Sequence, residues 1–281
     1  MNENKKILTT KEFVEKYDLM AKKALGQNFL LDSNIVDKIM RLSLHEQGLE
    51  NLGGERVIEI GPGPGGLTQA VLRCGPEALK VIEMDERCLK ILAEIKEFYP
   101  CLDVVNGDAL KFDWEGEFSQ NGEGHVVSNL PYNISVVLLA MWLSSIKRYK
   151  SLTLMFQKEV ADRILAGKDC KDYGRISVLA QLQCKVVRLF DLPPTCFVPQ
   201  PKIWSSVLLF VPRDEVLSGK VLEKVEYLTG LAFAQRRKMI RQSLKSVENI
   251  LGILEELGIE PTLRAENLSP NDYKEIAKRL V

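Results

Sequence analysis

Four consecutive residues, Asn129-Leu130-Pro131-Tyr132, offer the most specific chemistry in the sequence. The amine N6 of adenine is a poor nucleophile because its lone pair is delocalised into the ring. The side-chain oxygen of Asn129 and the main-chain carbonyl of Leu130 can accept both N6 hydrogens and favour a pyramidal nitrogen. Pro131 restricts the residue before it, which fixes where that carbonyl points. Tyr132 offers a ring face for base stacking. Together they predict methyl transfer to an adenine amine.

A glycine-rich turn at 61–66 is the candidate cofactor site. It matches the dinucleotide pattern G-x-G-x-x-G, a weak signal on its own. Pro62 and Pro64 each lack the N–H that a pyrophosphate cradle needs. S-adenosylmethionine carries no phosphate, and Gly61 and Gly63 would let the main chain approach its methionine tail. The turn therefore favours S-adenosylmethionine over a nicotinamide cofactor.

Two carboxylates follow the next two expected strands. Glu83 ends the second strand, where a carboxylate can accept hydrogen bonds from ribose hydroxyls. Asp108 follows the third strand and can accept from an adenine amine. Because ligands bind at the carboxyl ends of strands in open α/β sheets, both acids are candidate cofactor contacts.

The elements that must position these residues alternate between short apolar strands and helices. Strands are expected at 56–60, 79–84, 102–105, 125–128 and 152–156, and helices at 32–46, 67–73, 86–98, 134–146 and 158–166. This alternation predicts an α/β fold, a Rossmann-like methyltransferase sheet that is mostly parallel. Strand-like segments at 185–190 and 207–211, joined by a proline-rich loop without a helix, predict an antiparallel edge hairpin.

The chain changes character near residue 213. The expected methyltransferase domain covers 1–212, with a polar, partly helical arm at 1–20. A small all-α domain that binds RNA is expected at 213–281, with helices at about 216–234, 236–247, 250–257 and 272–280.

Composition limits the partners and the location. Lys+Arg and Asp+Glu both number 38, so a nucleic-acid partner must be served by local patches. The six cysteines have no C-x-x-C spacing and only two histidines accompany them, so we expect reduced thiols and no metal site. The longest apolar run, 134–143, is too short to span a bilayer. These features predict a cytoplasmic protein, and the lack of an apolar surface stripe predicts a monomer.

Over residues 21–245 the sequence resembles the rRNA adenine N6,N6-dimethyltransferases of the small ribosomal subunit. The shared motifs are K-A-L-G-Q-N-F-L at 23–30, E-I-G-P-G at 59–63, V-I-E at 81–83, N-L-P-Y-N-I at 129–134, Q-K-E-V at 157–160, Y-G-R at 173–175 and F-V-P-Q-P-K at 197–202. The runs at 26–30 and 197–202 are specific, whereas the glycine turn is common to most methyltransferases.

The resemblance implies further roles. Cofactor contacts are implied for Asn28, Leu30, Gly61, Glu83, Asp108 and Asn129. Phe197 is implied to face Tyr132, so that the two rings clamp a flipped-out adenine. The implied substrate is a pair of adjacent adenosines in a hairpin near the 3′ end of small-subunit rRNA, each receiving two methyl groups.

A basic segment in the C-terminal region is the candidate RNA contact. Arg237, Arg241 and Lys245 would lie on one face of the expected helix, with Arg236 and Lys238 beside them. The segment carries no acid, which favours contact with RNA phosphates over an ordinary solvated face.

Three other functions share some of these sequence features. A DNA adenine N6-methyltransferase would use the same four-residue signature on the adenine amine, but such enzymes usually have a separate target-recognition region. A ribosome-assembly or transcription factor that lost catalysis is disfavoured by the intact acids and signature. A nicotinamide dehydrogenase is disfavoured by Pro62 and Pro64.

Overall fold

The computed structural model describes residues 6–19 and 27–281. The two ends of the predicted arm (1–5 and 20) and Gly26 of the G-Q-N-F-L run lie outside the described residues. The chain divides into two compact units. The first comprises Met1–Leu138, Arg148–Lys158 and Val187–Val211, and the second comprises Leu139–Lys147, Glu159–Val186 and Pro212–Val281.

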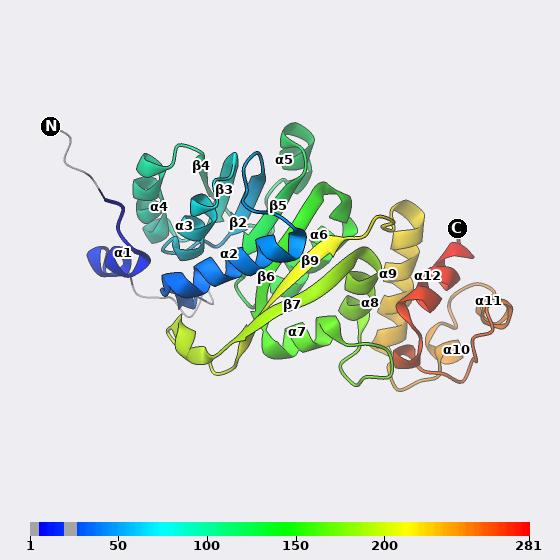
Figure 1. Ribbon diagram of the computed structural model, residues 1–281. Helices are drawn as coiled ribbons and strands as arrows, with labels where there is room; N and C mark the ends of the chain where they lie inside the picture. Colours follow the sequence, from blue (N-terminus) through cyan, green and yellow to red (C-terminus); the bar gives the residue numbers. More distant parts are fainter. Residues whose placement is uncertain (1–5, 20–26) are drawn as a thin grey trace. The chain divides into compact units, whose positions relative to one another are not determined.

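A seven-stranded sheet confirms the predicted fold class (Figure 1). Its strands are β2 (Arg56–Ile60), β3 (Ala78–Glu83), β4 (Leu102–Asn106), β5 (Gly124–Ser128), β6 (Tyr149–Gln157), β7 (Cys184–Leu192) and β9 (Ser205–Pro212). The order is β4-β3-β2-β5-β6-β9-β7, and the pairs from β4 to β6 are parallel. β5 is buried along its whole length, as expected for a sheet covered on both faces.

Antiparallel pairing was predicted for the last two strands of the sheet domain, and the structure has an antiparallel pair at that end of the sheet. β9 pairs antiparallel with β6, and the edge strand β7 is its other neighbour. The connection from β7 to β9 holds only a short 3-10 helix and a two-residue strand, so it lacks the long crossover that a parallel return requires.

Helices of the first unit begin at local caps. They are α1 (Thr10–Lys16), α2 (Ser33–Gln47), α3 (Gly66–Arg73), α4 (Glu86–Phe98) and α5 (Trp114–Asn121), and α6 (Ser135–Ser144) starts in this unit. Asp32 caps α2 and Asp85 caps α4 through side-chain bonds to main-chain N–H groups. α5 was not predicted because its polar sequence has no apolar period.

A two-stranded sheet in the first unit was also missed. β1 (Phe29–Leu30) pairs antiparallel with β8 (Phe197–Val198), so that Phe29 lies opposite Val198 and Leu30 opposite Phe197. Two-residue strands carry no periodic signal, and only the tertiary fold brings these two sequence motifs together.

The second unit is almost wholly helical. Its helices are α7 (Lys158–Leu165, whose first residue belongs to the first unit), α8 (Arg175–Gln183), α9 (Gly219–Ala234), α10 (Ile240–Ser243), α11 (Ile250–Glu256) and α12 (Pro270–Lys278). Among the described residues, 3-10 helices occur at η2 (Ile146–Arg148), η3 (Pro194–Cys196) and η4 (Ala265–Asn267). Phe233 packs between Tyr173 and Tyr273, with ring centroids 5.8 and 5.9 Å away. No helix among the described residues is long and apolar enough to cross a membrane.

The predicted helix at 236–247 is wrong. Only Ile240–Ser243 is helical, and the residues before it form turns. Met239 pairs with Arg264 in an isolated β-bridge, and the next N–H donates to the carbonyl of Leu263. Because these main-chain groups bond a neighbouring segment, they cannot form the i to i−4 ladder of a longer helix.

Candidate active site

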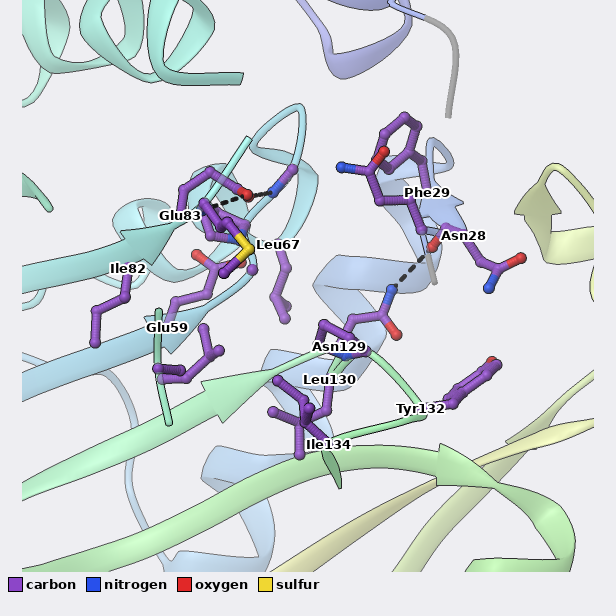
Figure 2. A pocket seen from close by; sticks show the side chains of 18 of the residues that line it. Asn28, Phe29, Glu59, Leu67, Ile82, Glu83, Asn129, Leu130, Tyr132 and Ile134 are labelled. Atoms are coloured by element: carbon purple, nitrogen blue, oxygen red, sulfur yellow. Dashed lines mark hydrogen bonds between the residues drawn. The ribbon is translucent and has the colours of Figure 1, made fainter. Parts of the chain in front are cut away.

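A cavity of about 350 Å³ opens at the carboxyl ends of β2, β3 and β5 (Figure 2). Ten of the residues singled out in the sequence line it: Asn28, Leu30, Gly61, Gly63, Glu83, Asp108, Asn129, Leu130, Pro131 and Tyr132. The structure therefore brings the glycine turn, both strand-end acids and the four-residue signature to one place. Phe197 is not among the lining residues.

The glycine turn is shaped by contacts with the segment 27–30. Gly63 has a φ of 55°, which L-residues rarely adopt. A Cβ there would lie 3.1 Å from the Phe29 ring, and one on Gly66 would lie 2.7 Å from the carbonyl oxygen of Leu30. The glycines thus serve close packing within the chain as well as approach to a ligand.

Glu83 is held by main-chain donors. One carboxylate oxygen accepts from Gly63 N at 2.9 Å, and the other accepts from Met84 N and Asp85 N at 2.8 Å. Burial raises the pKa of the Glu83 carboxyl and outweighs these three hydrogen bonds. A carboxylate has about four acceptor positions. One position therefore remains, fixed in direction, for a ligand hydroxyl.

Asp108 and Asn129 each have one side-chain oxygen that accepts no hydrogen bond from the neighbouring main chain. Asp108 Oδ1 accepts from Leu110 N at 2.9 Å, which leaves Oδ2. Asn129 Nδ2 donates to the carbonyl oxygen of Asn28 at 3.1 Å, drawn as a dashed line in Figure 2. This bond assigns the amide orientation. Within the described residues Asn129 Oδ1 accepts no hydrogen bond, so it can accept one from a ligand amine.

Tyr132 is fixed at the far end of its ring. Its hydroxyl lies 2.7 Å from Ser205 Oγ at the start of β9, and Ser135 Oγ donates to its carbonyl. Burial raises the pKa of the Tyr132 phenol, so the hydroxyl stays protonated. The ring lines the cavity in one orientation, as stacking on a base requires.

Glu59 belongs to the E-I-G-P-G motif, but the sequence assigned it no role of its own. It lines the cavity, its side chain is 1% exposed, and its Oε2 has no hydrogen-bond partner. Burial raises the pKa of the Glu59 carboxyl to about 8; the Thr68 hydroxyl, which lies nearby without meeting hydrogen-bond geometry, lowers it, and the Glu83 carboxylate raises it further. An acid at the last-but-one position of a strand, just before the glycine turn, was the available signal. A cationic ligand group would supply the missing partner.

The structure does not bring Phe197 to the cavity wall. Its side chain is 1% exposed and lies in the hydrophobic core, opposite Leu30 in the β1–β8 pair. In this conformation its ring presents no open face for a base.

The basic residues differ from one another. Arg236 is engaged: its Nε donates to Glu266 Oε2 at 2.6 Å and its Nη2 contacts the carbonyl of Cys170. Arg237, Lys238, Arg241 and Lys245 are exposed and form no ion pair within the part of the chain that the structure describes.

Fold and site together define a Rossmann-like class I methyltransferase. The chain belongs to the ribosomal RNA adenine dimethylase family, whose model matches residues 19–281. It is 47% identical over 271 residues to a ribosomal RNA small subunit methyltransferase A of Mesorhizobium japonicum, covering 94% of each chain. It is 46% identical to the protein of that name from Xanthobacter autotrophicus, covering 95% of this chain and 92% of the other.

Solved structures agree with this assignment. A dimethyladenosine transferase from Plasmodium falciparum superposes with a TM-score of 0.75 at 25% identity, covering 87% of this chain and 94% of that one. The 23S rRNA methyltransferase ErmE superposes with a TM-score of 0.66 at 24% identity, covering 90% and 99%, and shows the common fold.

Proposed function

We propose that this chain transfers methyl groups from S-adenosylmethionine to the N6 amines of two adjacent adenosines in a hairpin near the 3′ end of small-subunit rRNA, and so acts in small-subunit biogenesis. Each adenosine becomes N6,N6-dimethyladenosine. The observation that carries the proposal is the single cavity that joins the Asn129–Tyr132 signature to the glycine turn. The family and the names of the close relatives support the choice of rRNA.

The residues of the cavity fit S-adenosylmethionine. The free acceptor position of Glu83 suits a ribose hydroxyl, and Asp108 Oδ2 suits the adenine amine. The unpartnered oxygen of Glu59 suits the methionine ammonium. When bound, the cofactor supplies an electrophilic methyl group on a sulfonium centre.

The signature would act on the target base. Asn129 Oδ1 and the Leu130 carbonyl accept the two hydrogens of N6, which localises the lone pair on nitrogen. Tyr132 holds the flipped-out base by stacking, since chemistry on a base requires its removal from the helix. No general base is needed because the aminium product is acidic enough to lose its proton to water.

We propose that RNA is held by Arg237, Lys238, Arg241 and Lys245, with Arg236 acting indirectly through its bond to Glu266. Residues 213–281 would be the RNA-binding domain and 1–212 the methyltransferase domain. The working form would be a cytoplasmic monomer. Reversing the charges of Arg237 and Arg241 should weaken rRNA binding and make its salt dependence shallower, by about one unit of slope per lost phosphate contact. If filter binding gives the variant the same salt dependence as the wild type, Arg237 and Arg241 do not contact RNA phosphates.

One incubation tests the proposed function. The protein is mixed with labelled S-adenosylmethionine and either undermethylated small ribosomal subunits or duplex DNA, and the digested nucleosides are separated. Labelled N6,N6-dimethyladenosine from the subunits is expected. Label in DNA alone would indicate a DNA methyltransferase, and no label from a chain that still binds the cofactor would indicate a non-catalytic factor.

A further inference from the structure

Residues 198–204, from the last residue of β8 to the start of β9, form an exposed run with three large apolar side chains. Val198 is 52% exposed, Ile203 37% and Trp204 49%. Of the three tryptophans in the chain, Trp114 and Trp142 are buried, so Trp204 alone presents its indole to solvent. An exposed tryptophan is a strong stacking surface left without a partner.

Both ends of this run are tied to the wall of the active-site cavity. At its start, Val198 lies opposite Phe29, which lines the cavity. At its end, Trp204 precedes Ser205, whose Oγ lies 2.7 Å from the hydroxyl of the cavity residue Tyr132. The main chain at both ends of the run therefore lies near the cavity wall, with Tyr132, on which the target base is proposed to stack, bonded next to its C-terminal end.

The main chain at Trp204 is anchored. Its carbonyl oxygen accepts from Lys158 N at 2.9 Å, and the next residue pairs with Gln157 at the end of β6. The indole thus projects from a backbone fixed by two elements of the first unit. A tryptophan side chain has only two rotatable bonds, so it loses little conformational entropy when a base stacks on it.

We propose that Trp204 is a stacking platform for an unpaired nucleotide next to the target adenosine, so that Tyr132 holds the reacting base and Trp204 holds its neighbour. This inference rests on the proposed rRNA substrate. Successive bases of a single strand commonly stack on successive aromatic side chains. The exposed Lys202 in the same run can meet the phosphate between them. An apolar partner protein would gain nothing from that charge, which favours RNA over a second copy of this chain.

The first test uses the intrinsic fluorescence of Trp204. An RNA hairpin with two adjacent unpaired adenosines is titrated into the full chain saturated with S-adenosylhomocysteine. Stacking should quench the emission of the wild type, while Trp204→Phe should show no quenching because both remaining tryptophans are buried. Unchanged wild-type emission at RNA concentrations that saturate binding by filter assay would overturn the proposal.

The second test separates binding from chemistry. Trp204→Ala should raise the KM for undermethylated small subunits about tenfold while kcat changes little, as expected for loss of one stacked base. Trp204→Phe should restore most of the affinity. Val137→Ala, which removes a similarly exposed apolar side chain on α6, outside the cavity lining and the proposed RNA-binding domain, is the control and should behave like the wild type.

The outcomes are distinguishable from failure of the proposed function. If the wild type yields no dimethyladenosine in rRNA, the proposed function fails, whatever Trp204 does. If the wild type is active and Trp204→Ala keeps the wild-type KM, the stacking platform fails and the function stands. A dimer in sedimentation that Trp204→Ala converts to a monomer would assign the run to self-association and overturn the proposal.

Discussion

The two halves of the cavity are held in place in different ways. On the cofactor half, Glu83 is fixed by donors that lie 20, 1 and 2 positions away in the sequence. On the substrate half, Asn129 is oriented by a carbonyl 101 positions away and Tyr132 by a hydroxyl 73 positions away. The Glu83 carboxylate is thus held by donors within residues 63–85, whereas the side chains of the substrate half are oriented by partners remote in sequence.

This difference has a physical consequence. A site built from local main-chain bonds keeps its geometry when distant parts of the chain shift, because short loops constrain it. A site oriented by remote partners loses its geometry when either partner is altered, and positioning errors of about 1 Å can cost about 10²-fold in rate. Asn129, whose orientation in the substrate half sets where the reacting amine lies, should therefore be the residue most sensitive to a conservative substitution.

The largest effect is expected at Asn129. Asn129→Ala removes the N6 acceptor, and Asn129→Asp keeps an oxygen but replaces the donor to the Asn28 carbonyl with a repelling carboxylate. Both should lower the methyl-transfer rate at saturating cofactor by about 10²–10³-fold, measured in single turnovers. Wild-type rates in the Asp variant would show that the Asn28 contact is not needed.

A smaller effect is expected at Glu83. Glu83→Gln replaces one carboxylate oxygen with an NH₂ group, which donates hydrogen bonds and cannot accept them. In one amide orientation the NH₂ group faces the N–H of Gly63, and in the other it faces the N–H groups of Met84 and Asp85. In both orientations a donor faces a donor. Affinity for S-adenosylhomocysteine should fall about 10-fold to 100-fold, a cost of one buried unsatisfied donor. Calorimetric titration measures it, with the exposed Glu86→Gln as control. Equal affinities of the two variants for S-adenosylhomocysteine would show that Glu83 does not bind the cofactor.

A pH dependence should come from Glu59. Its pKa rises from 4.5 to about 8 on folding, so the folded state holds a proton that the unfolded state releases between these values. The contribution of Glu59 to the free energy of unfolding must therefore fall as pH rises from 4.5 to 8. Glu59→Gln removes this loss, so the melting temperature of the variant minus that of the wild type should grow between pH 5 and pH 8. A constant difference would contradict the buried proton.

Ligand binding gives an independent check on Glu59. If its carboxylate pairs with the methionine ammonium, binding of S-adenosylhomocysteine at pH 7 should release a proton. Calorimetry in two buffers with different ionisation enthalpies measures that release, and Glu59→Gln should abolish it.

The smallest effect is expected for the Tyr132–Ser205 bond. Tyr132→Phe keeps the stacking ring and Ser205→Ala removes the partner. A double-mutant cycle in urea unfolding should give a coupling of about 1 kcal/mol, as for a typical buried hydrogen bond. Methylation by Tyr132→Phe should stay within several-fold of the wild type. A loss as large as that of Asn129→Ala would show that the hydroxyl takes part in the reaction.

Elements with strong local signals were predicted well. β2 spans Arg56–Ile60 and α4 spans Glu86–Phe98 as expected, because an apolar run and an acidic cap mark them. α8 (Arg175–Gln183) was missed because its N-cap, Gly174, has no side chain and most of its residues are buried, which removes the amphipathic period. The helix expected at 236–247 was wrong because its main-chain bonds go to another segment.

By itself, the sequence determined the type of sheet, the glycine turn, the strand-end acids and the signature after β5. These features depend on periodicity and on residues close together in the chain. Only the tertiary structure decided the orientation of the Asn129 amide, the burial of Phe197, the unpartnered oxygen of Glu59 and the exposure of Trp204. The reason is physical: each depends on contacts or burial set by segments remote in sequence, and local patterns carry no record of those neighbours.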